Sequence, residues 1–327
     1  MSQRVGVVFD ANAMSGVGLL VQPADYRGSL NGFRNERGPP APAGTRTRHS
    51  LAAGCFAVHP FILALAYCRL MPPARESLSF DRASHYYDRT RALPADAAAA
   101  VTDLLLGELS GRGRVLEIGI GTGRVGYPLH RSGLELYGID ISAPMLDKLR
   151  EKPGGSNLPT ALADSTRLPF AKSGFGAAFA CHVLHLIPQW RQAVAELVRV
   201  VASGGVVLVD PGGLERGDSA TISQRFIDEI GGRRPGMQDP SELDAAFAEQ
   251  GASLRPLEPV KVRRKVTFGE IIDDLEAGLY SATWEASQKQ RNKAAVVVRT
   301  WAEETFGALD EQRTISWDIR WRAYDLP

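Results

Sequence analysis

Residues 115–126 read VLEIGIGTGRVG, a run in which a short apolar strand leads directly into three glycines at alternate positions, Gly119, Gly121 and Gly123. Glycine tolerates a positive φ and lets a ligand approach the backbone amides, because it has no Cβ. A helix that follows such a turn presents unpaired amides and a partial positive charge at its N-terminus. The stretch therefore predicts a site for a nucleotide-like ligand at the carboxyl end of a buried strand.

The glycines alone leave two cofactor classes open. Counted from Gly119, the dinucleotide fingerprint Gly-x-Gly-x-x-Gly fails at Arg124, but counted from Gly121 it is met at Gly126. Glu117 separates the classes better, because a carboxylate beside the loop repels a pyrophosphate and can pair with a cationic ligand. S-adenosylmethionine has no phosphate and carries an ammonium and a sulfonium, so it fits this carboxylate. The simpler alternative is that Glu117 complements the helix dipole.

Two further carboxylates follow the next two predicted strands. Asp140 ends the second strand in YGIDIS, where α/β nucleotide sites place an acid on ribose hydroxyls. Asp164, with Ser165 beside it in ALADSTRLPF, follows the third strand and could bind the amine of adenine; an ordinary turn or helix cap is the alternative. Acids at the ends of successive strands predict a common crevice at the topological switch point of a parallel sheet.

Apolar runs alternate with helical patterns from Phe80 onward, which is typical of an α/β fold with a parallel sheet. After Asp210 the pattern becomes mainly helical. The alternation from Ile315 to Ala323 predicts a last strand that closes the sheet. The five candidate strands before Asp210 are Val115–Ile118, Leu136–Ile139, Leu158–Ala163, Ala177–Cys181 and Val206–Val209.

Composition excludes several classes of protein. The 327 residues are 44% apolar and 23% charged, which is a globular composition. Because 38 basic residues balance 37 acidic ones, no net field attracts nucleic acid or an anionic membrane.

Cys55, Cys68 and Cys181 form neither a disulfide framework nor a zinc ligand set, so a cytoplasmic location is expected. The uncharged stretch Leu51–Tyr67 is short for a membrane span and contains His59 and Pro60, so no span is expected.

Taken together, these motifs resemble a class I S-adenosylmethionine-dependent methyltransferase, close to the small-molecule branch that includes ubiquinone and menaquinone biosynthesis methyltransferases. The matching segments are ExGxGxG from Glu117, the acid Asp140, the Ala163–Ser165 motif, FACHVLHLIPQW (179–190) and Ser203–Asp210. FDRASHYYDRTRALP (80–94) is similar to the helix that folds over the cofactor in this branch. The resemblance covers residues 80–215, and reaches the C-terminus if the closing strand is counted.

The resemblance implies a Rossmann-like, doubly wound fold with a mostly parallel seven-stranded sheet, helices on both faces and a helical insertion after strand five. The cofactor would be S-adenosyl-L-methionine and the partner a small-molecule acceptor, with no nucleic acid expected. The Pro- and Gly-rich composition of residues 1–78, without a sustained apolar period before residue 50, predicts a poorly ordered extension. The resemblance implies a methyltransferase domain at 79–327. Within that domain we expect the cofactor-binding core at 80–211, a helical acceptor-binding region at 212–310 and the closing strand at 313–327.

We transfer the functional roles known in the family only to residues of this sequence that match the family's motifs. The segment 179–190 lacks an Asn-Pro-Pro-Tyr sequence, which disfavours methylation of amino nitrogens in DNA or glutamine. It also lacks the cysteine pair expected for cytosine methylation. The resemblance implies that Gly119, Gly121 and the neighbouring backbone hold the methionine portion of the cofactor. Asp140 would bind the ribose, Ile141 and Met145 would flank the adenine, and Asp164 with Ser165 would bind the edge of the adenine. The further expected cofactor-binding residues are Tyr87, Glu117, Gly123 and Cys181.

Methyl transfer is an in-line displacement that needs alignment and exclusion of water but no metal, and a general base is optional. His182, at the end of the fourth strand, is the candidate base, with a structural role equally open. His185 lies in an apolar run typical of a packed histidine. Tyr280, Trp284 and Trp301 could line an acceptor pocket, although aromatic residues at helical spacing are usually core. The basic run 263–265 favours a solvent-exposed strand edge over a site for an acidic substrate or RNA.

Three functions remain open from these residues. A methyltransferase acting on oxygen, carbon or nitrogen explains all the acids. A nicotinamide-dependent oxidoreductase would explain the glycines, and a non-catalytic binding module of the same fold would explain the lack of an assured catalytic residue. The sequence identifies neither the acceptor nor the oligomeric state.

Overall fold

The computed structural model describes residues 76–212, 217–232 and 235–327. The expected extension at 1–78 lies outside these residues except for its last three, and the apolar stretch 51–67 lies outside them entirely. Within the described ranges, no helix combines the length and apolar character that crossing a membrane requires.

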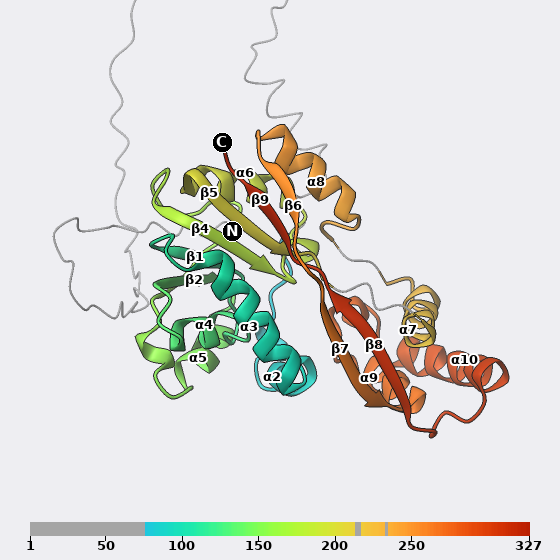
Figure 1. Ribbon diagram of the computed structural model, residues 1–327. Helices are drawn as coiled ribbons and strands as arrows, with labels where there is room; N and C mark the ends of the chain where they lie inside the picture. The colour runs from blue at the N-terminus through green and yellow to red at the C-terminus, as the bar shows by residue number, and fades with distance from the viewer. Residues whose placement is uncertain (1–75, 213–216, 233–234) are drawn as a thin grey trace, which may run out of the picture. The chain divides into compact units, whose positions relative to one another are not determined.

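A seven-stranded sheet forms the centre of the molecule in the order β3-β2-β1-β4-β5-β9-β6 (Figure 1). The first five strands are parallel, whereas β9 is antiparallel to both of its neighbours. The strand order reverses between β1 and β4, which is the topological switch point. The predicted α/β class is therefore confirmed. The strands are β1 (Val115–Ile118), β2 (Leu136–Asp140), β3 (Thr160–Leu162), β4 (Phe175–Cys181), β5 (Val201–Asp210), β6 (Ser253–Pro256) and β9 (Arg322–Asp325).

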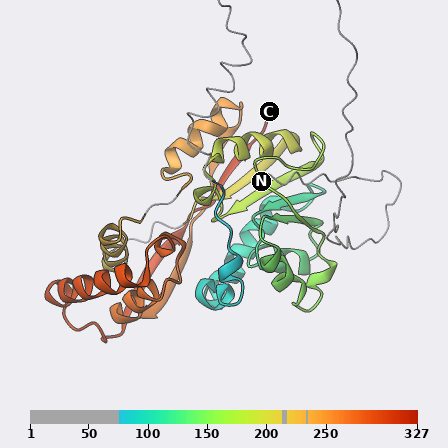
Figure 2. The same ribbon diagram turned by 180° about the vertical axis from the view of Figure 1, so that it is seen from behind.

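Helices cover both faces of this sheet, as Figure 2 shows from behind. Leu116 and Ile118 point into a core shared with α6 (Trp190–Val200) and α8 (Pro240–Glu249). Val115, on the opposite side of the same strand, packs with α3 (Ala95–Leu109), α4 (Gly126–Arg131) and α5 (Ala143–Arg150). Glu117 shares this second face by the two-residue period of a strand, so its carboxyl is directed beneath the glycine loop.

A smaller unit, which we call the lobe, is built on the antiparallel ribbon of β7 (Val260–Val266) and β8 (Arg313–Ile319). It contains α7 (Asp218–Glu229), α9 (Phe268–Glu276) and α10 (Gln288–Phe306). These three helices share an apolar cluster that is separate from the two clusters of the main sheet. The lobe occupies the expected helical insertion, although that insertion also supplies β6 and β7.

The C-terminal stretch corrects the prediction of a single closing strand over 313–327. Residues 313–319 pair with β7 in the lobe, and only residues 322–325 close the main sheet against β5. The change of sheet falls at Trp321, which is buried against Phe179 with ring centroids 6.3 Å apart. A ribbon and a sheet each bury one face, so the same alternation continues through both and cannot reveal the change of partner.

Candidate functional site

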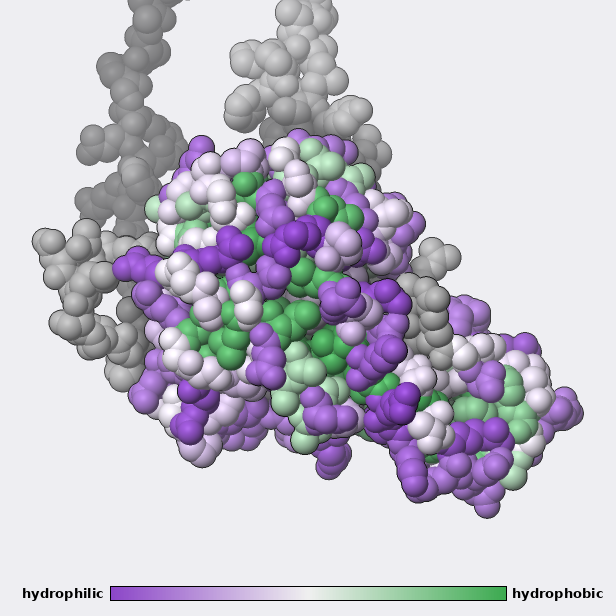
Figure 3. Space-filling view, in the orientation of Figure 1, coloured by the Kyte–Doolittle hydropathy of each residue, from purple (hydrophilic) through white to green (hydrophobic). Residues whose placement is uncertain are grey.

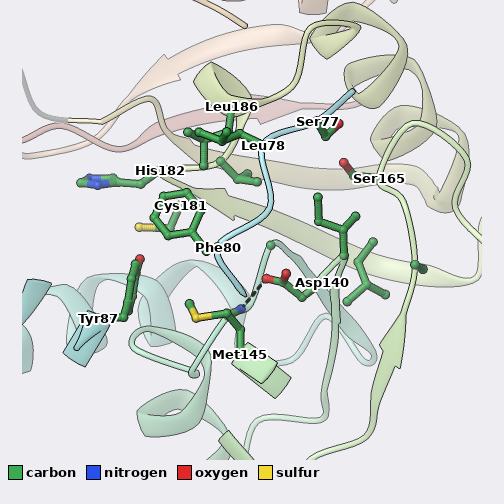
Figure 4. Close-up of a pocket in the computed structure, with 16 residues that line it drawn as sticks. Ser77, Leu78, Phe80, Tyr87, Asp140, Met145, Ser165, Cys181, His182 and Leu186 are labelled. Atoms are coloured by element: carbon green, nitrogen blue, oxygen red, sulfur yellow. Dashed lines mark hydrogen bonds between the residues drawn. The ribbon is translucent and has the colours of Figure 1, made fainter. Parts of the chain in front are cut away.

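A pocket opens at the carboxyl ends of β1, β2 and β4, beside the switch point (Figure 4). It is lined by residues of the glycine loop, of the ends of β2 and β4, and of the segment that precedes α3. Nine residues singled out from the sequence line it: Tyr87, Gly119, Gly121, Asp140, Ile141, Met145, Ser165, Cys181 and His182. The sequence reasoning missed Ser77, Leu78, Phe80, Ile139, Ala163, Val183 and Leu186.

Asp140 and the glycine loop hold each other in place. The Gly121 amide donates to Asp140 Oδ2 at 2.8 Å (Figure 4). The Ser142 amide donates to Asp140 Oδ1, also at 2.8 Å. Burial raises the pKa of Asp140, although these amides oppose the shift. Gly121 has φ +56°, and a Cβ there would lie 3.1 Å from Met145 Cε. The loop therefore needs glycine both for its conformation and for its close approach to α5.

Glu117 is 2% exposed and lies beneath this loop. It accepts a hydrogen bond from the Gly126 amide, while its Oε2 is buried without a hydrogen-bond partner among the described residues. Burial raises the pKa of Glu117 well above its usual range, more than the nearby Arg124 lowers it. A Cβ at Gly126 would lie 2.0 Å from Oε2, so this glycine makes room for the carboxyl. Burial therefore favours the protonated form of Glu117, whereas an approaching cation would favour its ionised form.

Arg124 is a second charged group at the site, and sequence reasoning treated it only as a mismatch. Its Nη2 donates to Cys181 Sγ at 3.3 Å and its Nη1 to the Arg91 carbonyl at 3.5 Å, which are weak partners for a guanidinium. No carboxylate within the described ranges forms an ion pair with it. Burial would lower the pKa of Arg124, but Cys181, Tyr87 and nearby acids raise it. The signal in the sequence was an arginine directly after the last loop glycine, at the start of a helix.

His182 and Asp210 form a hydrogen-bonded pair at the ends of β4 and β5. His182 Nε2 lies 3.0 Å from Asp210 Oδ2, and the His182 amide donates to the Asp210 carbonyl at 3.0 Å. The Asp210 side chain is 4% exposed, and that of His182 is 34% exposed. Burial would raise the pKa of Asp210, but His182 and the Gly212 amide more than offset this and the pKa is lowered. His182 has φ +54°, a conformation costly for a non-glycine residue.

Cys181 completes this polar layer. Its Sγ lies 3.8 Å from Asp210 Oδ2 and also accepts from Arg124. Burial is the main cause that raises the pKa of the Cys181 thiol, so this side chain stays protonated. Cys181, His182 and Asp210 thus bring a thiol, an imidazole and a carboxylate together at one edge of the pocket.

Five predicted site residues lie outside the pocket lining: Glu117, described above, and the four that follow. Asp164 is exposed, and its Oδ1 accepts from the Thr166 amide at 2.8 Å, which is the ordinary turn left open above. Gly123 faces α5, where a Cβ would lie 2.5 Å from Leu149 Cδ1. Trp284 and Tyr280 are likewise not among the residues that line the pocket. His185 and Trp301 also lie outside the lining, with Trp301 packed on Phe306 in the lobe.

The segment of residues 77–91, which we call the strap, connects the pocket with the lobe. It contains η1 (Asp81–Ala83) and α2 (Tyr87–Arg91). Phe80 lines the pocket and packs on Trp284 with ring centroids 4.7 Å apart. Arg91 Cζ lies 4.2 Å from the centre of the Tyr280 ring, and its Nη2 donates to the Leu279 carbonyl at 3.0 Å. The two predicted acceptor residues therefore contact the strap.

Comparison with known proteins identifies the central segment. Residues 116–209 match the family model described as a methyltransferase domain. The chain is 32% identical over 127 residues to phosphatidylethanolamine N-methyltransferase of Cereibacter sphaeroides, an alignment that covers 36% of this chain and 62% of that protein. It is 33% identical over 133 residues to malonyl-[acyl-carrier protein] O-methyltransferase of Salmonella typhimurium, covering 39% of this chain and 50% of that protein. The chain thus spans about half to three fifths of the length of these relatives.

Solved structures show the same fold. The YcgJ protein of Bacillus subtilis superposes with a TM-score of 0.50 at 17% identity, over 70% of this chain and 99% of that one. A candidate methyltransferase of Bacillus halodurans superposes with a TM-score of 0.51 at 16% identity, over 70% of this chain and 100% of that one. At these identities the likeness concerns the fold alone, and it agrees with the predicted Rossmann-like arrangement.

Proposed function

We propose that this chain, whose residues 116–209 match the model of a methyltransferase domain, transfers a methyl group from S-adenosylmethionine to a small organic acceptor. One observation carries the proposal: Asp140 lines the pocket at the switch point and is tied to the glycine loop, and the buried carboxyl of Glu117 lies beneath that loop, outside the pocket lining. Acids in and beneath the pocket suit a positively charged adenosyl donor better than a phosphorylated cofactor.

The residues present fit the amino-acid end of S-adenosylmethionine. Glu117 Oε2 is buried without a partner among the described residues, and an ammonium is the group that would both satisfy it and stabilise its ionised form. Among the described residues, Arg124 donates only to a thiol and a carbonyl, so its guanidinium can also bind a carboxylate. An acid and a guanidinium on one side of the glycine loop together complement a zwitterion.

The other end of the pocket fits an adenosyl group. Asp140 uses its two oxygens to hold the Gly121 and Ser142 amides, and it retains lone pairs that ribose hydroxyls can donate to. Ile141 and Met145 give the pocket apolar walls there, and Ser165 adds a hydroxyl. We therefore assign adenine binding to these apolar walls. The exposed Asp164 instead stabilises a turn by accepting the Thr166 amide.

S-adenosylmethionine supplies, when bound, a methyl group activated by positively charged sulfur. The chain's contribution to proton transfer is His182. His182 Nε2 donates a hydrogen bond to Asp210, which leaves Nδ1 as the atom that would take a proton from the atom that is methylated. This base is required for a hydroxyl acceptor and dispensable for an acceptor that is already nucleophilic. Leu78, Phe80 and Tyr87 of the strap exclude water from the pocket.

The names of the relatives include nitrogen, carbon and oxygen methyltransferases, so they favour no single acceptor. We assign acceptor binding to the lobe and the strap, with Tyr280 and Trp284 acting through the strap residues that they contact.

Calorimetric titration with S-adenosylhomocysteine tests cofactor binding. We expect micromolar affinity, with a large loss in Asp140→Ala and none in Asp147→Ala, an exposed aspartate on α5 that pairs only with Arg150. Transfer of labelled methyl groups into a metabolite extract then distinguishes an enzyme from a binding module. Enhanced fluorescence of a reduced nicotinamide cofactor on mixing, without S-adenosylhomocysteine binding, would instead indicate an oxidoreductase.

A further inference from the structure

Asp88, on helix α2 of the strap, ties the strap to the glycine loop. The Thr122 hydroxyl donates a hydrogen bond to Asp88 Oδ1 at 2.5 Å, and Lys152 Nζ forms an ion pair with Asp88 Oδ2 at 2.8 Å. Thr122 lies in the glycine loop, between Gly121 and Gly123, and Lys152 follows α5. One carboxylate thus connects the strap with both the glycine loop and the end of α5. The methyl-transfer chemistry described above uses none of these three side chains.

Thr122 is a polar residue in a buried position. It is 1% exposed, and the glycines on either side of it have φ +56° and +77°, so the loop conformation fixes the direction of its side chain. A buried hydroxyl without a hydrogen-bond partner is costly. The bond to Asp88 satisfies this hydroxyl, and the charged acceptor makes it stronger than a bond between neutral groups.

Solvent reaches the second contact of Asp88. The Asp88 side chain is 50% exposed and that of Lys152 is 25% exposed. Hydrophilic side chains lie at the surface around α2, in the lower half of Figure 3. Ion pairs that water reaches contribute little to stability. The connection between strap and loop therefore depends mainly on the hydrogen bond from Thr122, and one such bond can break while the fold stays intact.

The strap forms one wall of the pocket, because Leu78, Phe80 and Tyr87 line it (Figure 4). Tyr87 directly precedes Asp88 in α2, so a movement of Asp88 away from the loop displaces Tyr87 as well. Asp88 and its two partners are not among the residues that line the pocket. A ligand in the pocket therefore lies against the strap, whereas the contacts of Asp88 join protein groups only.

Building on the proposed methyl transfer, we propose that Asp88 is a positioning residue that holds the strap over S-adenosylmethionine, and that breaking its bond to Thr122 opens the route for cofactor entry and product release. Because its contacts join protein groups only, they hold the strap equally with and without the cofactor. Loosening them therefore speeds entry and exit alike and leaves the affinity nearly unchanged. A residue that touches the cofactor would instead change the affinity, mainly through the dissociation rate.

The first test is stopped-flow measurement of S-adenosylhomocysteine binding to the full-length protein, followed by protein fluorescence. Trp284 packs on Phe80 of the strap with ring centroids 4.7 Å apart, so its emission responds to the position of the strap. Asp88→Ala removes a charge-assisted hydrogen bond and is expected to raise the association and dissociation rate constants about tenfold each, while Kd changes less than about threefold. Asp147→Ala, the matched control, removes an exposed ion pair with Arg150 on α5 and should leave both rate constants unchanged.

A second test needs no ligand. Hydrogen exchange of the α2 amides, residues 87–91, measures how readily the strap opens. Asp88→Ala and Thr122→Val should each accelerate this exchange about tenfold. The double variant should exceed the faster single variant only slightly, because all three proteins lack the same hydrogen bond. Asp88→Asn, which keeps an acceptor for Thr122 but no charge, should exchange at a rate between those of wild type and Asp88→Ala.

Two results would overturn the role of Asp88. One is a dissociation rate that rises in Asp88→Ala at an unchanged association rate, because Asp88 would then act on affinity. The other is exchange at the wild-type rate in both Asp88→Ala and Thr122→Val. Failure of wild-type protein to bind S-adenosylhomocysteine would count against the proposed function alone, because the exchange measurement decides without a ligand whether Asp88 holds the strap.

Discussion

Replacing Glu117 by glutamine separates the ligand role of this side chain from its structural role. The side chain keeps its shape, and the amide oxygen can still accept the hydrogen bond from Gly126. It can no longer carry a negative charge. If Glu117 ionises to hold the cofactor ammonium, the variant loses a charge-assisted hydrogen bond worth about 1.5–3 kcal/mol. Such a loss weakens binding of S-adenosylhomocysteine about 10- to 150-fold.

Stability should change in the opposite direction. The pKa of Glu117 is raised in the folded protein, so the unfolded chain loses its proton first as the pH rises above about 4.3. Folded wild-type protein therefore loses stability between that pH and the raised pKa of Glu117. Glutamine does not titrate, so the stability of the variant relative to wild type should rise with pH from about 4.3 up to the raised pKa of Glu117 and level off above it. Urea denaturation at several pH values measures this.

The assay for binding is calorimetry in buffers of different ionisation enthalpy. Wild-type protein should release a proton from Glu117 when S-adenosylhomocysteine binds, so the measured heat should depend on the buffer. The Glu117→Gln variant should lack this contribution. Unchanged affinity together with unchanged proton release in the variant would refute the assigned role of Glu117.

Further predictions concern packing and catalysis. Gly126→Ala gains about 0.5–1 kcal/mol of helix propensity, but its Cβ would lie 2.0 Å from Glu117 Oε2, and such overpacking costs about 1–3 kcal/mol. Urea denaturation should therefore show a net loss of unfolding free energy, part of which Glu117→Ala restores in the double variant. A Gly126→Ala protein that is more stable than wild type would contradict this. Asp210→Asn should lower kcat for a hydroxyl acceptor at least about tenfold and change the dependence of kcat on pH, while the affinity for S-adenosylhomocysteine is retained. An unaltered dependence on pH would exclude the His182–Asp210 pair as the base. Trp321→Ala should cost about 3–5 kcal/mol of unfolding free energy, because this side chain is buried where the ribbon meets the sheet; a loss below about 1 kcal/mol would show that the site repacks freely.

Local patterns predicted the centre of the fold well. The limits of β1 match the prediction, and Asp140 ends β2 beside the glycine loop as expected. Both depend on short-range rules: a buried parallel strand is continuously apolar, and a loop under a ligand needs glycine. The domain boundaries proposed from the sequence stay a prediction, as do the ligand roles of the pocket residues.

Contacts between distant segments were not predictable in the same way. Asp210 was expected only as the end of a strand, and its partnership with His182 depends on the pairing of β4 with β5. Arg124 contacts Cys181 and the Arg91 carbonyl, which are far from it in sequence. The C-terminal stretch pairs with two different sheets, but the apolar residues alternate with the same two-residue period in both parts, so the sequence does not show where the pairing changes. Each of these features depends on which segments become neighbours, and one sequence does not state that.

The central claim is that the acids at the switch point bind a positively charged adenosyl donor. Equilibrium dialysis of the intact protein against radiolabelled S-adenosylmethionine tests it most directly. We expect saturable retention of one molecule per chain with a micromolar Kd, reduced in Glu117→Gln and abolished in Asp140→Ala. A wild-type protein that is folded by circular dichroism and yet retains no label would contradict the claim.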